Sequence, residues 1–260
     1  MLRKRKSAVL ALPAALAISI FSPGRAWGID FYEIQIYGVD TTPKGRLQAE
    51  LHSNGVTSAD GPAARQTLNP YQLHETLEMT YGVSEHSEVG QYIASAVQHG
   101  GPWEYAGART KFHFGLTDAE KSFIGIGGNV ELDYMRRDFE DNPLSLELRP
   151  ILEKRIGRFD ATVNAPFSKP FNGRTPLGMQ FGPSGLVSYD LVPQLTPALE
   201  YYGDMGTLLH MPRAAAQQHF LLPAINVHLM SQLEINLGVG FGLTEASRGV
   251  IVKSILGWTF

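Results

Sequence analysis

The sequence predicts an all-β protein: a closed antiparallel transmembrane β-barrel of about twelve strands, which follows an N-terminal signal peptide. Three observations support this prediction. The first residues have the charge and hydropathy of an export signal. Alternating apolar and polar residues recur between turn residues along the rest of the chain. The last segment, 249–260, alternates in the same way and ends in the aromatic residue Phe260.

The export signal has the usual three parts. Residues 3–6 are all basic, residues 7–21 are apolar, and small residues at 26 and 28 indicate cleavage before Ile29. The apolar run is shorter than the roughly 20 residues that a spanning helix needs, which favours a cleaved signal over an anchor. We therefore expect a signal peptide at 1–28, a periplasmic extension or extra short strand at 29–44, and an outer-membrane barrel at 45–260.

Composition excludes several classes of protein. Cleavage would leave 17 basic and 25 acidic residues, a net charge of −8. This balance argues against a nucleic-acid partner, which favours a basic surface. The chain has no cysteine, so a disulfide framework and a thiolate metal site are both excluded.

The strands follow from the alternation and from the turn residues between them. Counting back from Phe260, the connections near residues 84, 118, 157, 192 and 230 fall on the periplasmic side, and all are short. The external ones are mostly longer, as in outer-membrane barrels. Aromatic residues near strand ends favour a barrel with interfacial girdles over a soluble β-sandwich. The expected strands are 45–52, 71–81, 87–97, 103–115, 122–135, 144–156, 159–167, 177–189, 196–203, 217–229, 234–243 and 249–260.

Alternation also assigns side chains to the two faces of each strand. A Lys or Arg facing lipid near the midplane costs about 2–4 kcal/mol, so the charged faces should point into the lumen. The inward set has eleven acids and five bases, and an open lumen would therefore favour cations. A symmetric 136–143 loop would place Glu131 opposite Arg149 and Asp133 opposite Glu147. The lumen-facing candidates are Arg109, Lys111, His113, Glu131, Asp133, Glu147, Arg149, Glu153, Arg155, Glu200, Glu234 and Lys253.

Chemical motifs are few. The glycine-rich segments 125–128 and 238–242 open no helical pattern, so we expect them to leave lumen space rather than to bind phosphate. The eight histidines show no helical zinc spacing, and we expect no metal, cofactor or catalytic residues. A metal site built across strands stays open as an alternative.

Several stretches of strand and turn residues form a recognisable pattern. They are Tyr32-Glu33, Tyr37-Gly38, Gly45, Glu50-Leu-His-Ser-Asn54, His74-Glu75, Tyr81-Gly-Val83, Glu88-Val-Gly90, Glu147-Leu-Arg-Pro-Ile151, Ala198-Leu-Glu-Tyr-Tyr-Gly203 and 238–260. In these stretches the chain resembles a family of uncharacterised bacterial outer-membrane β-barrel proteins. The layout is also similar to the outer-membrane transporters named for the MetA pathway of phenol degradation. The resemblance implies fold and location, and it implies no ligand or catalytic residue.

The final strand resembles the one by which outer-membrane barrels are recognised for assembly, with Trp258 and Phe260 as the signal. The expected partners are therefore outer-membrane lipid, the barrel-assembly machinery and a small solute of unknown identity. We expect a passive channel or uptake protein with a net acidic lumen. One alternative is a non-conducting barrel with a structural or partner-binding role through its external loops. A second is an outer-membrane hydrolase, which would need a Ser–His pair on the wall.

Overall fold

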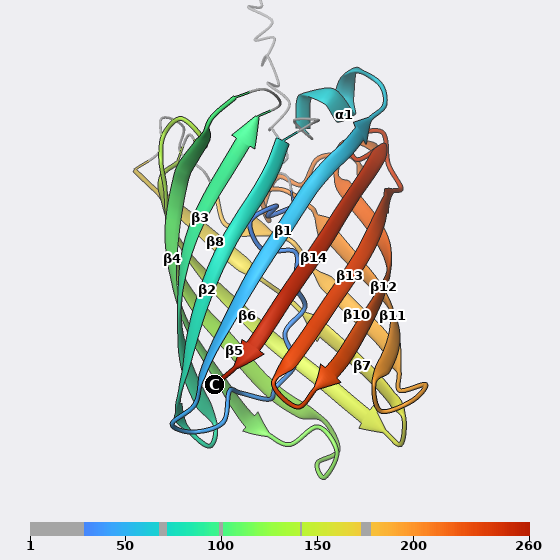
Figure 1. Ribbon diagram of the computed structural model, residues 1–260. Helices are drawn as coiled ribbons and strands as arrows, with labels where there is room; N and C mark the ends of the chain where they lie inside the picture. Colours follow the sequence, from blue (N-terminus) through green and yellow to red (C-terminus); the bar gives the residue numbers. More distant parts are fainter. Residues whose placement is uncertain (1–28, 68–71, 99–100, 141, 173–177) are drawn as a thin grey trace, which may run out of the picture.

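The computed structural model describes residues 29–67, 72–98, 101–140, 142–172 and 178–260, and the predicted signal peptide lies outside this part. The described chain forms a closed antiparallel β-barrel, which confirms the predicted fold class (Figure 1). Among the described residues, no helix is both long and apolar enough to span a bilayer.

The wall consists of fourteen strand segments with little helix between them. The segments are β1 (Leu47–Ala59), β2 (Gln72–Ser84), β3 (Ser87–Gln98), β4 (Trp103–Thr117), β5 (Gly125–Met135), β6 (Leu144–Ile156), β7 (Phe159–Asn164), β8 (Phe167–Phe171), β9 (Gln180–Phe181), β10 (Ser184–Tyr189), β11 (Leu195–Asp204), β12 (Gln218–Met230), β13 (Leu233–Gly242) and β14 (Gly249–Thr259). The helix α1 (Pro62–Thr67) and the 3-10 helix η1 (Ala214–Ala216) lie in connections.

The sheet closes on itself. β1 pairs with both β2 and β14, while β5 pairs with both β4 and β6. β7 and β8 both pair with β6, so they are two parts of one strand, and β9 with β10 forms another. The wall therefore has twelve strands, as predicted.

The two interrupted strands break next to one another at prolines. Pro166 separates β7 from β8, and Pro183 separates β9 from β10. Proline has no N–H for the ladder, so it favours such breaks. Backbone bonds bridge the gap: the Gly182 N–H donates to the Pro166 carbonyl at 3.3 Å, and the Gly203 N–H donates to the Pro183 carbonyl at 2.8 Å.

Several predicted boundaries are wrong, chiefly where polar or small residues resemble a loop. The first strand continues through Ser53 to Ala59 because Gly55 pairs with both Leu73 and Val252. The predicted 168–176 loop likewise begins with strand β8, which pairs along β6. In both cases pairing with neighbouring strands overrides the local turn composition.

The predicted register between β5 and β6 is also wrong, by two residues. Glu131 lies opposite Glu147, and Asp133 lies opposite Ser145. The Met135 N–H donates to the Pro143 carbonyl at 2.8 Å. This bond continues the β5–β6 pairing by one residue pair toward the loop and fixes the register.

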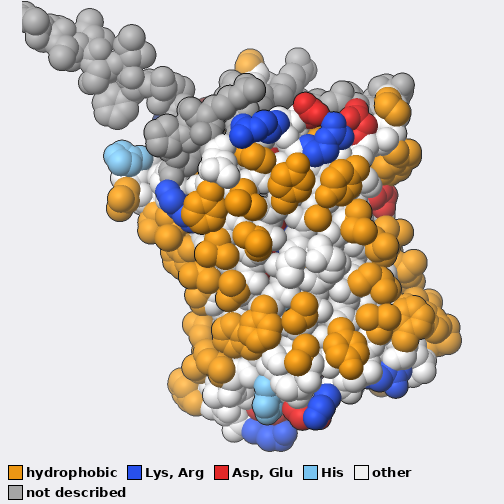
Figure 2. All heavy atoms as spheres, turned by 90° about the vertical axis from the view of Figure 1, so that its left-hand side faces the viewer, with side chains coloured by type: hydrophobic (Ala, Val, Ile, Leu, Met, Phe, Trp, Pro, Cys, Tyr) orange, Lys and Arg blue, Asp and Glu red, His pale blue; other side chains and the backbone are white. Residues whose placement is uncertain are grey.

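The outer wall is apolar, as a lipid-facing surface requires. Leu51, Ile93, Leu148 and Leu256 are among the residues that point outward from their strands and are 41–54% exposed. Figure 2 shows hydrophobic side chains spread over the wall, with charged side chains gathered near its two ends. The fold is therefore that of a transmembrane barrel.

The chain ends beside the start of the wall. The Phe260 N–H donates to the Leu47 carbonyl at 2.8 Å, and its carbonyl accepts from Arg46. The side chains of Trp258 and Phe260 are 38% and 58% exposed and point away from the lumen. Their role as an assembly signal stays a prediction.

A charge on the outer wall should destabilise the barrel. We expect Leu148→Arg to lower the free energy of unfolding from lipid vesicles by about 2–4 kcal/mol, because it places an arginine in the lipid-facing band. Urea titration followed by tryptophan fluorescence measures this. Leu209→Arg is the control, because Leu209 is 83% exposed in the connection between β11 and β12 and should tolerate the charge. Equal stability of both variants would contradict the orientation.

Candidate functional site

The candidate site is the barrel lumen, because the strands turn their charged side chains inward. Most of the predicted lumen-facing residues are buried, and they come from many different strands. Arg109, Glu147 and Arg155 are partly buried, and Glu234 is exposed within the lumen, where it borders a cavity. The buried members are Lys111, His113, Glu131, Asp133, Arg149, Glu153, Glu200 and Lys253.

The lumen is not empty: residues 29–44 run through it from the end that carries α1 toward the end that carries the C-terminus (Figure 1). We expected this segment as a periplasmic extension or an extra strand, and the structure differs on both counts. The described residues 29–44 include no strand. The segment instead meets the inner wall through side chains, so its backbone polar groups need no ladder.

Side chains from around the wall hold the backbone of this luminal segment. The Asn164 side chain accepts from the Tyr37 N–H and donates to the Tyr37 carbonyl, both at 2.8 Å. The Ile29 N–H donates to the Gln218 amide oxygen at 3.0 Å. The Val39 N–H donates to a Glu153 oxygen at 2.6 Å. These anchors come from β7, β12 and β6, so the segment is attached to several sides of the wall.

Glycines of the segment and of the wall allow this close approach. A Cβ atom on Gly38 would lie 2.7 Å from a Glu153 carboxylate oxygen. A Cβ on Gly127 would lie 2.7 Å from the Phe114 carbonyl and 3.3 Å from the Val39 side chain. We predicted that Gly125–Gly128 leaves space in the lumen. The luminal segment occupies part of that space.

An ion-pair network ties the first part of the segment to β4, β5 and β6. The buried Glu33 carboxylate contacts both Arg109 and Arg149. Arg109 also pairs with Asp30 at 2.5 Å and with Asp133. Breaking a buried pair leaves an uncompensated charge and costs several kcal/mol, so this network stabilises the docked segment.

The same arginines resolve the like-charge contact that the observed register creates. Glu131 and Glu147 are directly opposite one another, which is unfavourable without a cation. The Arg149 guanidinium lies 2.7 Å from Glu147 and 3.7 Å from Glu131. Sequence reasoning placed these residues on the inner face but did not foresee that Glu33 of the segment completes the cluster.

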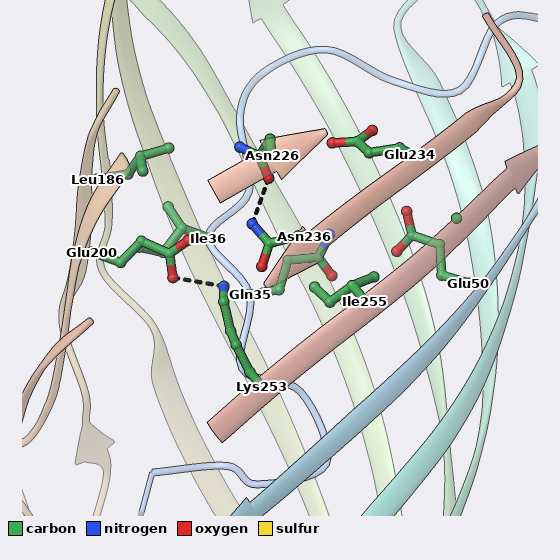
Figure 3. Close-up of a pocket in the computed structure, with 11 residues that line it drawn as sticks. Gln35, Ile36, Glu50, Leu186, Glu200, Asn226, Glu234, Asn236, Lys253 and Ile255 are labelled. Carbon is green, nitrogen blue, oxygen red and sulfur yellow. Dashed lines mark hydrogen bonds and ion pairs between the residues drawn. The ribbon is translucent and has the colours of Figure 1, made fainter. Parts of the chain in front are cut away.

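A polar cavity of about 140 Å³ lies beside the luminal segment, on the side of β1 and β10 to β14 (Figure 3). Lys253 donates to Glu200 at 2.6 Å across it. Asn226 and Asn236 bond to one another from β12 and β13. Glu50 and Glu234 also border the cavity, without an ion pair to Lys253. The lining residues are Gln35, Ile36, Glu50, Leu186, Glu200, Asn226, Glu234, Asn236, Lys253, Ile255 and Gly257.

Arg155 lies in a separate group, near the end of the luminal segment that leads into β1. It pairs with Glu153 at 2.5 Å and with Asp40 at 2.6 Å. The structure thus divides most of the predicted lumen residues into this group, the network around Arg109 and the cavity, while Lys111 pairs with Glu78 and His113 contacts Asn129. Sequence reasoning missed Asn164 and Gln218, because a single inward polar residue gives no pattern.

Comparison with known proteins gives a likeness of fold only. No family model and no curated protein sequence matches the chain. Among solved structures, the COG4313 outer membrane channel from Pseudomonas putida F1 is similar with a TM-score of 0.64 at 10% identity, over 88% of this chain and 100% of that one. The KdgM porin has a TM-score of 0.58 at 8% identity, over 82% and 99%. The NanC porin has 0.52 at 9%, over 82% and 98%. The fold is that of outer-membrane porins and channels.

Loosening the luminal segment should expose its buried residues. Asn164→Ala leaves the Tyr37 N–H and carbonyl without their partner, at about 1–3 kcal/mol for each unsatisfied group. The chain has no natural cysteine, so Ile34→Cys provides a single thiol at a position that is 1% exposed. We expect Asn164→Ala to raise the rate of maleimide labelling at this thiol about tenfold or more.

The matched control for this experiment is Asn226→Ala. Asn226 bonds to Asn236 across the cavity, and no hydrogen bond of its side chain to the segment is present in the described chain. Labelling should then stay near the rate of the parent. Fast labelling already in the parent protein would show that the segment does not occupy the lumen.

Proposed function

We propose that the chain is an outer-membrane channel for small solutes whose lumen is narrowed by the segment 29–44. The observation that carries this proposal is the closed twelve-strand wall with a charged inner face, which still leaves a polar cavity beside the segment. A wall of this size lies between eight-stranded barrels, which side chains fill, and sixteen-stranded porins, which are open. The apolar outer wall supports a position in lipid.

The charges favour cationic or neutral polar solutes. Glu50, Glu200 and Glu234 border the cavity, and Lys253 is its one basic residue among the described lining. Fixed charges of one sign select ions of the opposite sign. A KdgM porin has been solved in complex with disordered oligogalacturonate, an acidic sugar chain. The acidic cavity of this chain supports the opposite preference.

The luminal segment is suited to act as a constriction because it is separate from the ladder. Its anchors are side-chain hydrogen bonds and ion pairs, so its release would leave every strand pairing of the wall in place.

A second candidate function is that of a non-conducting barrel that acts through its external loops. The same anchors favour this function if the segment never leaves the lumen. The hydrolase alternative gains no support: between described residues, the histidine rings bond to Asn129, the Asp40 carbonyl, Tyr201 and Gln217, and none bonds to serine.

Two finer statements belong to this proposal. The resemblance to transporters named for the MetA pathway of phenol degradation agrees with a channel for small solutes. The exposed aromatic end, Trp258 and Phe260, agrees with recognition by the barrel-assembly machinery.

Conductance in a planar bilayer tests the channel. We expect the protein without its signal peptide to open to small, cation-preferring currents. Deletion of residues 31–42 should raise the single-channel conductance several-fold, because it removes the segment that narrows the lumen. Unboiled and boiled samples should migrate differently on gels for both proteins, which controls for folding.

Ion preference should depend on the cavity acids. Glu234→Gln removes a carboxylate from the cavity lining and should weaken the cation preference, measured as the reversal potential in a salt gradient. Glu104→Gln, on the exposed end of β4, is the control. If neither the parent protein nor the folded deletion protein conducts, the chain is a non-conducting barrel and the channel proposal fails.

A further inference from the structure

A second site lies on the inner face of β1 and β2, apart from the Arg109 network. Glu50 and His52 are two residues apart on β1, so they share this face. Glu78 of β2 lies directly opposite Glu50. The His52 Nε2 atom is 3.4 Å from a Glu50 oxygen and 3.4 Å from a Glu78 oxygen, and the three ligand atoms lie within 4.8 Å of one another.

The polar atoms at the centre of this site lack hydrogen-bond partners. His52 is completely buried, and neither of its ring nitrogens has such a partner among the described residues. The Glu78 Oε2 atom, which faces His52, also has none. Buried polar groups are nearly always satisfied, and the two of these atoms that face one another, His52 Nε2 and Glu78 Oε2, leave room for a shared ligand between them.

The far oxygens of both carboxylates are already held by other side chains. The Gln48 amide donates to Glu50 Oε1 at 2.7 Å. Thr80 and Lys111 donate to Glu78 Oε1 at 2.8 and 2.7 Å. These contacts orient the two Oε2 atoms toward His52, as outer-shell hydrogen bonds orient the ligands of metal sites.

The local charge also favours a bound cation. Like charges directly opposite on neighbouring strands are unfavourable, and Glu50 and Glu78 are such a pair. Lys111 pairs with Glu78 and is 3.5 Å from Glu88, so one base meets three acids. With a neutral imidazole, the group carries two excess negative charges, which one divalent cation would neutralise.

We propose that Glu50, His52 and Glu78 bind a divalent transition-metal ion of the zinc type, through Nε2 of the histidine and one oxygen of each carboxylate. Zinc binds such ligands at about 2.0–2.2 Å, which puts neighbouring ligands of a tetrahedron roughly 3.3–3.5 Å apart. The two measured separations of 3.4 Å match this spacing. Three protein ligands leave a fourth position for water, and Glu50 also borders the cavity, which gives the ion a route in.

This site changes the expectation that the chain holds no metal, and it uses the cross-strand alternative that the sequence left open. It does not depend on whether the barrel conducts. The alternative is a site without a metal, in which a protonated His52 forms ion pairs with both Glu50 and Glu78. A protein in that state would not bind zinc.

Calorimetric titration with Zn²⁺ tests the proposal. The folded protein in detergent, stripped with EDTA, should bind one Zn²⁺ per chain. His52→Gln and Glu78→Gln should each weaken binding by at least about tenfold. Glu104→Gln removes a carboxylate from the exposed end of β4, outside the proposed site, and it should leave the affinity within about twofold of the parent.

Cobalt spectroscopy provides a readout that needs no variant. Co²⁺ bound to the parent protein should give the intense visible absorption of a four-coordinate nitrogen and oxygen site, and Zn²⁺ should displace it. No stoichiometric binding, a six-coordinate aquo spectrum, or unchanged affinity in a folded His52→Gln variant would each overturn the proposal. Unchanged affinity in the His52→Gln variant would mean that the acidic lumen attracts cations without a specific metal site.

Discussion

The need to satisfy every backbone polar group inside lipid determines the rest of this structure. Hydrocarbon offers no hydrogen bonds, so the sheet has to close, and it does so through the β1–β14 and β5–β6 pairings. Closure in turn separates the two faces of every strand. Leucines such as Leu148 cover the outside, and charged neighbours such as Arg149 must lie within.

Charges that are forced inward need partners, and the luminal segment supplies some of them. Glu33 contacts both Arg109 and Arg149. The partners that the wall itself supplies for these two arginines are Glu131, Asp133 and Glu147. The segment is therefore part of the electrostatics of the barrel and not only an obstacle in it. Around Glu50, His52 and Glu78, where Lys111 pairs with Glu78 alone of the three, a metal ion is the proposed further counter-charge.

The fold was predictable from the sequence because alternation is a local property. Lys111 and Glu131 could be assigned to the inner face from their immediate neighbours alone. The register was not predictable, because it depends on how the 136–143 loop folds. The position of residues 29–44 was also missed, since its partners Asn164 and Gln218 are far away in the chain and carry no pattern. Cross-strand sites such as the one at His52 depend on strand register as well, in that case between β1 and β2.

Methyl NMR of the protein without its signal peptide, in micelles, would show whether residues 29–44 lie inside the barrel. Ile34 and Ile251 belong to one buried apolar cluster with Leu222 and Phe220. With isoleucine δ1 methyl groups labelled, Ile34 should show cross-peaks to Ile251 and a chemical shift displaced by ring currents. A random-coil shift for Ile34 without cross-peaks to the wall would contradict the account.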